Sequence, residues 1–159
     1  MSTTFIVPAV FSRVLKEGYG AGAWHGPDLA SAVADVTPEH AFQRPAAGRH
    51  NIAEIVLHHT WFIRSVIGQL TARTPAPFVL PGEDWFELNQ KTEPRWPKIR
   101  SLLDDYQKQL VQVVAELEAG RTTSPLPEAE RFDLVLGITC HAIYHAGQIQ
   151  LIKRLVEAG

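Results

Sequence analysis

Apolar residues recur at helical spacing along most of this chain, whereas the apolar–polar alternation of β-strands is scarce. Three apolar stripes are long enough to define helices: Ile52, Ile55, Val56, Ile63, Val66, Ile67 and Leu70; Ile99, Leu103, Tyr106, Leu110, Val113 and Leu117; and Leu134, Ile138, Ile149, Ile152 and Val156. A helix with an apolar stripe buries that stripe against its neighbours. Since no convincing strand offers a sheet, the stripes predict an all-α helix bundle.

Local signals give the expected bounds of the helices. The first is expected over about residues 8–17, because the glycines of GYGAGAWHGP end it, and short helical pieces are expected in DLASAVADV and after Thr37. Asn51 and Glu54 have the spacing of a capping box and predict the start of the second long helix. The third is expected over residues 96–118 and the last over about residues 133–156. These four predict a four-helix bundle that forms a single domain over residues 1–159, although the long connections leave the order of helix directions open.

Charge and composition exclude several functions. The net charge is −2 and no run of Lys or Arg occurs, which argues against a protein that binds nucleic acid through bulk electrostatics. No apolar stretch approaches the ~20 residues of a membrane span, and the N-terminal sequence lacks the basic segment of a signal peptide. The single cysteine, Cys140, forms no intrachain disulfide and is expected to be a small core residue. We therefore expect a cytoplasmic protein whose partner is neither nucleic acid nor a membrane.

The segment GITCHAIYHAGQI carries two histidines, His141 and His145, on the apolar stripe of the last helix. Residues spaced by four point the same way on a helix and can share one metal ion. Burial of two imidazoles without polar partners is costly, so either a metal or hydrogen bonds to the protein must satisfy them. Spacing alone leaves both explanations open. Ala142 follows the first histidine, so the zinc-protease motif H-E-x-x-H is absent.

A third imidazole is available from the second long helix, where His58 and His59 are adjacent and cannot face the same way. The apolar stripe centres near His59 and has His58 on its flank, so periodicity slightly favours His59 as the buried residue. Three histidines from two helices, with coordination positions left open, are typical of a catalytic divalent-metal site. Imidazole ligands suit several metals, so the spacing does not identify the ion.

The segments HNIAEIVLHHTWF and HAIYHAGQI together resemble the DinB-like (DinB/YfiT) superfamily, and the resemblance extends from about Trp24 to Leu155. It implies a four-helix bundle that binds a divalent metal, nickel or zinc, through three histidines. Carried over by position, the ligands are His58, His141 and His145. His59 occupies a place that relatives usually fill with an aliphatic residue. The position within the family motif therefore favours His58 as the third ligand, whereas apolar periodicity favours His59. His59 remains the alternative third ligand.

The resemblance also implies a metal-dependent enzyme that acts on a small molecule, by metal-assisted hydrolysis or by S-transfer of a low-molecular-weight thiol, and it implies a homodimer. It transfers no catalytic base, because relatives often carry an acidic or polar residue where this chain has Ala142. An alternative from another class is a non-catalytic bundle of the stress-response type that binds a metal or a small molecule.

Four residues near the histidines have two interpretations each. Tyr144 either contacts a metal-bound water or is a packing residue, and Gln148 either supports a ligand or caps another buried polar atom. Asp84 and Trp85 lie in a long connection that either covers the site or is anchored by the tryptophan.

Overall fold

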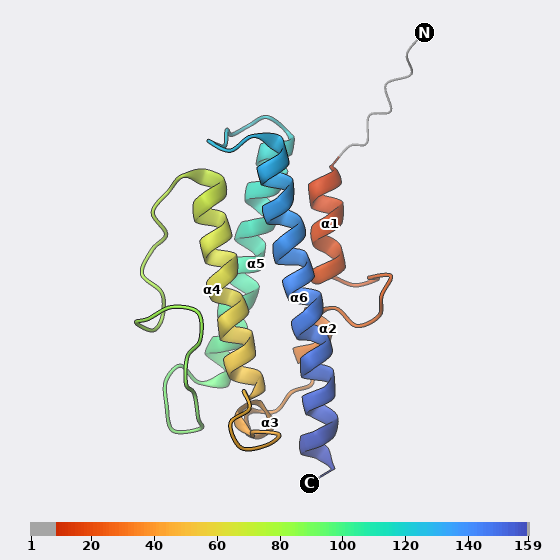
Figure 1. Cartoon of the computed structure of the whole chain (residues 1–159), viewed down its shortest axis with the longest axis vertical. Helices are drawn as coiled ribbons and strands as arrows, with labels where there is room; N and C mark the ends of the chain where they lie inside the picture. The colour runs from red at the N-terminus through yellow and green to blue at the C-terminus, as the bar shows by residue number, and fades with distance from the viewer. Residues whose placement is uncertain (1–8, 159) are drawn as a thin grey trace.

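The computed structural model describes residues 9–158, which form six α-helices and no β-strand (Figure 1). The helices are α1 (Val10–Gly18), α2 (Leu29–Val33), α3 (Pro38–Phe42), α4 (Ile52–Thr71), α5 (Trp96–Glu118) and α6 (Glu128–Glu157). The prediction of an all-α fold is confirmed.

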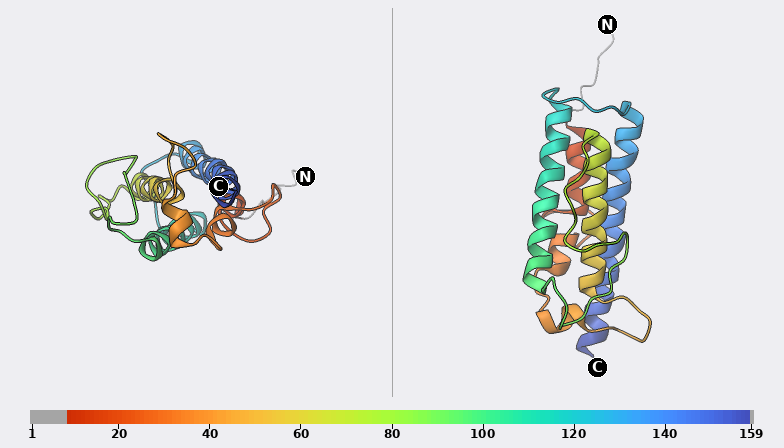
Figure 2. Two further views of the ribbon diagram at one scale, coloured as in Figure 1. Left: turned by 90° about the horizontal axis from the view of Figure 1, so that it is seen from below. Right: turned by 90° about the vertical axis from the view of Figure 1, so that its left-hand side faces the viewer.

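The four longest helices, α1, α4, α5 and α6, lie side by side along one axis (Figures 1 and 2). α4 packs against α5 and α6, and α1 packs against α6 and α5. The short helices α2 and α3 pack on α6 and α4. The interface between α4 and α6 matters most for function, because these two helices carry the histidines singled out in the sequence.

The chain does not pass through the bundle in simple up-and-down order. α4 and α5 point in the same direction, and α6 runs opposite to both (Figure 1). Parallel neighbours require a connection that returns the chain to the other end, and residues 72–95 provide it by running back along the outside of α4 (Figures 1 and 2). This crossover connection therefore lies beside the helix that carries His58 and His59.

Capping explains where α4 begins. The side-chain oxygen of Asn51 accepts a hydrogen bond from the backbone N–H of Glu54 at 2.9 Å, and the carboxylate of Glu54 accepts from the backbone N–H of Asn51 at 3.3 Å. The predicted capping box is present, and the bounds predicted for α5 are also confirmed. α6 begins at Glu128, earlier than the expected residue 133. Its first turn is polar and acidic, which suits the positive end of a helix dipole but leaves no apolar periodicity to detect.

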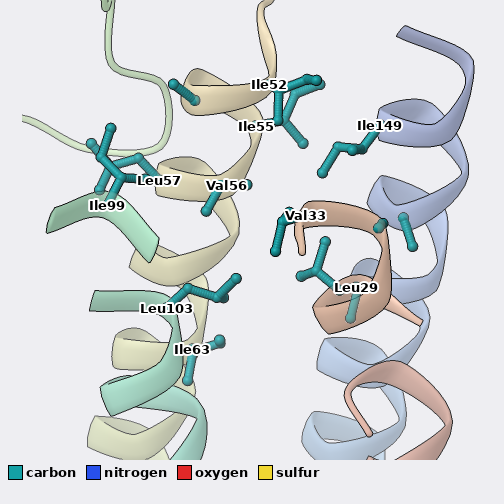
Figure 3. Packing of buried hydrophobic residues seen from close by; sticks show 14 of the residues in the cluster. Leu29, Val33, Ile52, Ile55, Val56, Leu57, Ile63, Ile99, Leu103 and Ile149 are labelled. Atoms are coloured by element: carbon teal, nitrogen blue, oxygen red, sulfur yellow. The ribbon is translucent and has the colours of Figure 1, made fainter. Parts of the chain in front are cut away.

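The core lies between the helices, where buried aliphatic side chains of α2, α4, α5 and α6 gather (Figure 3). Most positions of the predicted stripes are buried. The stripe of α5 is rotated from the prediction, since Gln107 and Val114 are buried while Tyr106 and Val113 are only half-buried. Val113 and Val114 are both apolar, so hydrophobicity alone could not choose between the two faces.

Cys140 is exposed, so the expectation that it is a core residue is wrong. α6 also exposes large apolar side chains, among them Tyr144, Leu151 and Leu155. Because this helix is apolar on its outer side as well, an apolar neighbourhood in the sequence does not indicate the inner face. Within residues 9–158, no helix combines the length and the hydrophobicity that a bilayer span requires.

The carboxylate of Glu54 is 1% exposed and accepts hydrogen bonds from several segments. Two guanidinium nitrogens of Arg44 donate to it at 2.5 and 3.0 Å, and the backbone N–H of Leu88 donates at 2.9 Å. Nδ1 of His50 lies 3.0 Å from Oε2. Burial alone would raise the pKa of Glu54, but the hydrogen bonds from Leu88, Arg44 and His50 outweigh burial and hold the pKa below 4.5. Glu54 therefore ties the start of α4 to the chain before it and to the crossover connection.

We predict that Glu54→Gln lowers the free energy of unfolding at pH 7 by roughly 2–4 kcal/mol, because a neutral amide replaces the charged acceptor of Arg44. Since the folded-state pKa lies below the unfolded value, the carboxylate stabilises the fold above pH 4.5, and this contribution is lost as the pH falls below that value. Urea unfolding at pH 7 and at lower pH measures both effects, and the difference between wild type and variant should shrink in acid. Glu87→Gln, at an exposed position of the crossover connection, is the control. Equal stability of wild type and Glu54→Gln at pH 7 would contradict this role.

Candidate metal site

Three histidines converge between α4 and α6. His58 comes from α4, and His141 and His145 come from α6. Nε2 of His141 lies 3.1 Å from Nε2 of His58 and 3.1 Å from Nε2 of His145. His58 and His145 are buried, and His141 is half-buried. The structure thus brings together the three residues that the sequence singled out as ligands.

The spacing of these nitrogens fits one metal ion. Imidazole nitrogens bind zinc at ~2.0–2.1 Å, so two nitrogens on the same ion can lie no more than about 4.2 Å apart. The two separations of 3.1 Å satisfy this limit. One donor atom from each of the three rings lies within 4.8 Å of the others. An all-imidazole set is suited to zinc, nickel, iron or copper.

The opposite nitrogen of each ring is held by a protein group. Nδ1 of His58 donates to the backbone oxygen of Asp84 at 3.0 Å and lies 2.9 Å from the Asp84 carboxylate. Nδ1 of His145 donates to the side-chain oxygen of Gln148 at 2.6 Å. An oxygen acceptor fixes the ring proton on Nδ1 and leaves the lone pair on Nε2, where the three rings meet. Gln148 therefore supports a proposed ligand.

His59 lies beside the cluster but outside the set of converging Nε2 atoms. Its Nδ1 is 2.7 Å from Nδ1 of His141, on the side of that ring that faces away from the other two histidines. His59 is fully buried, as periodicity indicated, while His58 is 5% exposed. Apolar periodicity thus identified the more buried residue, His59. The position within the family motif identified His58, the residue that joins the cluster.

Burial keeps the four rings neutral. It is the main cause that lowers the pKa of His141 to about 3 and the pKa of His145 to about 4, and neighbouring histidines lower both further. Burial also lowers the pKa of His58, against the opposing effect of Asp84. Complete burial places the pKa of His59 well below its ordinary value. Neutral imidazoles keep the lone pairs that a metal ligand needs.

The crossover connection is anchored on the cluster by Asp84 and Trp85. Asp84 adopts a left-handed backbone conformation, with φ of 66°, and directs both its carbonyl and its carboxylate at His58. The indole of Trp85 stacks on His58 with ring centroids 3.8 Å apart, and on His50 with centroids 3.7 Å apart. Phe62 contributes a second aromatic wall, with its centroid 5.0 Å from those of His58 and His141. The interpretation of this loop as one anchored by a tryptophan agrees with these contacts.

Tyr144 is 64% exposed and is not a core residue, but its ring packs edge-on against that of His145, with centroids 5.3 Å apart. Its hydroxyl accepts a hydrogen bond from Nε2 of Gln148 at 3.3 Å, which extends the chain of contacts from His145 to the surface.

A family model of the DinB superfamily matches residues 23–149 of the chain. The chain belongs to the DinB superfamily. The resemblance carried by HNIAEIVLH and HAIYHAGQI is therefore confirmed. Metal binding is typical of the superfamily, and the cluster of His58, His141 and His145 agrees with that property. No curated protein and no solved structure matches the sequence.

Sequence reasoning about this superfamily member did not predict which atoms of distant segments contact the histidines. Asp84 reaches His58 across 26 positions of the chain, and no local pattern relates the two. The contact of His59 with His141 spans 82 positions, although the presence of a second histidine in the aliphatic place was a signal that this position is unusual. Only the contact of Gln148 with His145 could be predicted from sequence spacing, because the two residues are one helical turn apart.

We predict that Gln148→Leu weakens zinc binding by about tenfold, because Nδ1–H of His145 loses the acceptor that orients the ring. Competition with a chromophoric chelator measures the affinity. Gln150→Leu, on the same helix and outside the cluster, is the matched control and should retain wild-type affinity. Unchanged affinity in Gln148→Leu would show that this hydrogen bond does not orient a ligand.

Proposed function

We propose that this protein is a metal-dependent enzyme whose divalent ion, zinc or nickel, is held by Nε2 of His58, His141 and His145. One observation carries the proposal: the three Nε2 atoms converge, and each Nδ1 on the opposite side of its ring is hydrogen-bonded to another residue. When bound, such an ion acts as a Lewis acid and lowers the pKa of a coordinated water or thiol.

The protein's own residues would hold and shield this centre. Asp84 and Gln148 orient two of the rings, and Trp85 and Phe62 cover ring faces with apolar surface. Trp85 is itself 37% exposed, so the residues that cover the cluster on this side reach the solvent.

Of the two chemistries, the contacts of the cluster favour S-transfer of a low-molecular-weight thiol to a small electrophile. Among the described residues, Asp84 is the carboxylate that contacts the cluster, through Nδ1 of His58 alone. Hydrolysis generally uses a positioned base to accept a proton from water. A thiol coordinated to a metal is deprotonated outright and needs no such base. Metal-assisted hydrolysis remains the second candidate.

We also propose a single-domain, cytoplasmic protein that forms a homodimer. Leu151 and Leu155, one turn apart on α6, are 59% and 51% exposed, and a second copy of the chain would cover them.

The metal site is tested by elemental analysis of tag-free protein after reconstitution. We expect about one equivalent of zinc or nickel in the wild type and less than about a tenth in His58→Ala, His141→Ala and His145→Ala. His40→Ala, outside the cluster, is the control and should bind like the wild type. Metal-free wild-type protein after reconstitution would rule out the site.

The reaction is tested with metal-loaded protein, a panel of low-molecular-weight thiols and an alkylating electrophile. S-transfer predicts that thiol consumption depends on metal and falls at least about a hundredfold in His141→Ala. Release of product from ester or amide substrates without thiol would instead support hydrolysis. If the loaded protein does neither, the alternative of a non-catalytic metal-binding bundle is correct.

A further inference from the structure

The hydrogen bond between His59 and His141 differs in kind from those that hold the other two rings. The oxygens of Asp84 and Gln148 that face His58 and His145 can only accept, so they fix a proton on each Nδ1. His59 instead presents a ring nitrogen, with its Nδ1 2.7 Å from Nδ1 of His141. A nitrogen of a neutral imidazole either donates or accepts, according to the tautomer. This partner therefore leaves both tautomers of His141 available.

We propose that the hydrogen bond between His59 and His141 reverses its direction when a metal binds. His59 is then a positioning residue that lets His141 serve as a hydrogen-bond donor in the metal-free cluster and as a ligand in the loaded one. This inference rests on the proposed metal site.

The metal-free direction follows from the other two rings. Asp84 and Gln148 leave a lone pair on Nε2 of both His58 and His145, and both lone pairs face Nε2 of His141 at 3.1 Å. A third lone pair there would repel them, whereas a proton on Nε2 of His141 makes a hydrogen bond. With its proton on Nε2, His141 accepts at Nδ1, so Nδ1–H of His59 is the donor.

The loaded direction is the opposite. Metal ligation through Nε2 of His141 would require its lone pair. The proton on Nδ1 of His59 would then pass across the hydrogen bond to Nδ1 of His141, which becomes the donor to Nδ1 of His59. His59 then carries its own proton on Nε2. Nε2 of His141 loses a proton and Nε2 of His59 gains one, so the pair exchanges no net proton with its surroundings. Each ring holds one proton before and after, so neither ring changes its charge.

The surroundings of His59 permit both directions. Its ring is fully buried, and no group within residues 9–158 hydrogen-bonds its Nε2. An acceptor there would hold the proton on Nε2, and a donor would hold it on Nδ1. Because neither is present among the described residues, the state of His141 decides the tautomer of His59.

Long-range ¹H–¹⁵N correlation spectra of the ¹⁵N-labelled full chain read the tautomers directly. After treatment with a chelator, we expect His141 protonated at Nε2 and His59 at Nδ1, and after zinc loading the reverse for both. His58 and His145 should stay protonated at Nδ1 in both states. If wild-type protein binds zinc but His59 and His141 keep their tautomers, this inference alone is overturned. If it binds no zinc, the metal site is wrong and the inference falls with it.

Two substitutions separate hydrogen bonding from packing. His59→Phe fills the volume without a polar atom and should weaken zinc binding by about 10- to 100-fold, because Nδ1–H of His141 then has no acceptor. His59→Asn keeps an amide that can accept or donate near the position of Nδ1 and should restore affinity to within about tenfold of the wild type. Thermal melts establish that both variants fold. Wild-type affinity in His59→Phe would overturn the role, as would complete loss of zinc in both variants, which would mark His59 as a ligand.

Discussion

The buried carboxylate of Glu54 is the constraint on which the arrangement around the histidines depends. It caps α4, pairs with Arg44 and accepts the backbone N–H of Leu88 in the crossover connection. These contacts fix where α4 starts and where the connection crosses it. The same carboxylate holds His50, on which Trp85 stacks, and Trp85 in turn stacks on His58. A group one turn before His58 thus determines how that ring is enclosed.

The all-α fold followed from the sequence because each long helix has an apolar stripe that only another helix could cover. Asn51 and Glu54 gave the start of α4, since a capping box depends on residues close in sequence. The polar first turn of α6 and the exposed Cys140 were not predicted. In both cases hydrophobicity was the wrong signal, because a helix can start in a polar turn and can be apolar on its outer face.

For the candidate site, the pair His141 and His145 was recognisable from spacing, and family register chose His58 over His59. Periodicity alone chose differently, because it reports the depth of a side chain and not the direction in which its nitrogen points. The contacts of Asp84 and Trp85 with His58 depend on the path of a long connection. Such a path is set by tertiary packing, and neither residue carries a local pattern that reveals it.

The crossover connection has a consequence for how this protein can diversify. The converging rings belong to α4 and α6, whose positions are determined by the shared core, whereas Asp84 and Trp85 belong to a segment outside the bundle (Figure 2). Substitutions at the exposed positions of this segment leave the packing of the helices intact, whereas Phe86 and Leu88 of the same segment are buried in the core. Selection can therefore reshape the exposed part of this segment while the helices keep the three imidazoles in place, as long as Asp84 keeps its contact with His58. The helices are thus constrained by packing, and the exposed positions of the connection are constrained mainly by recognition.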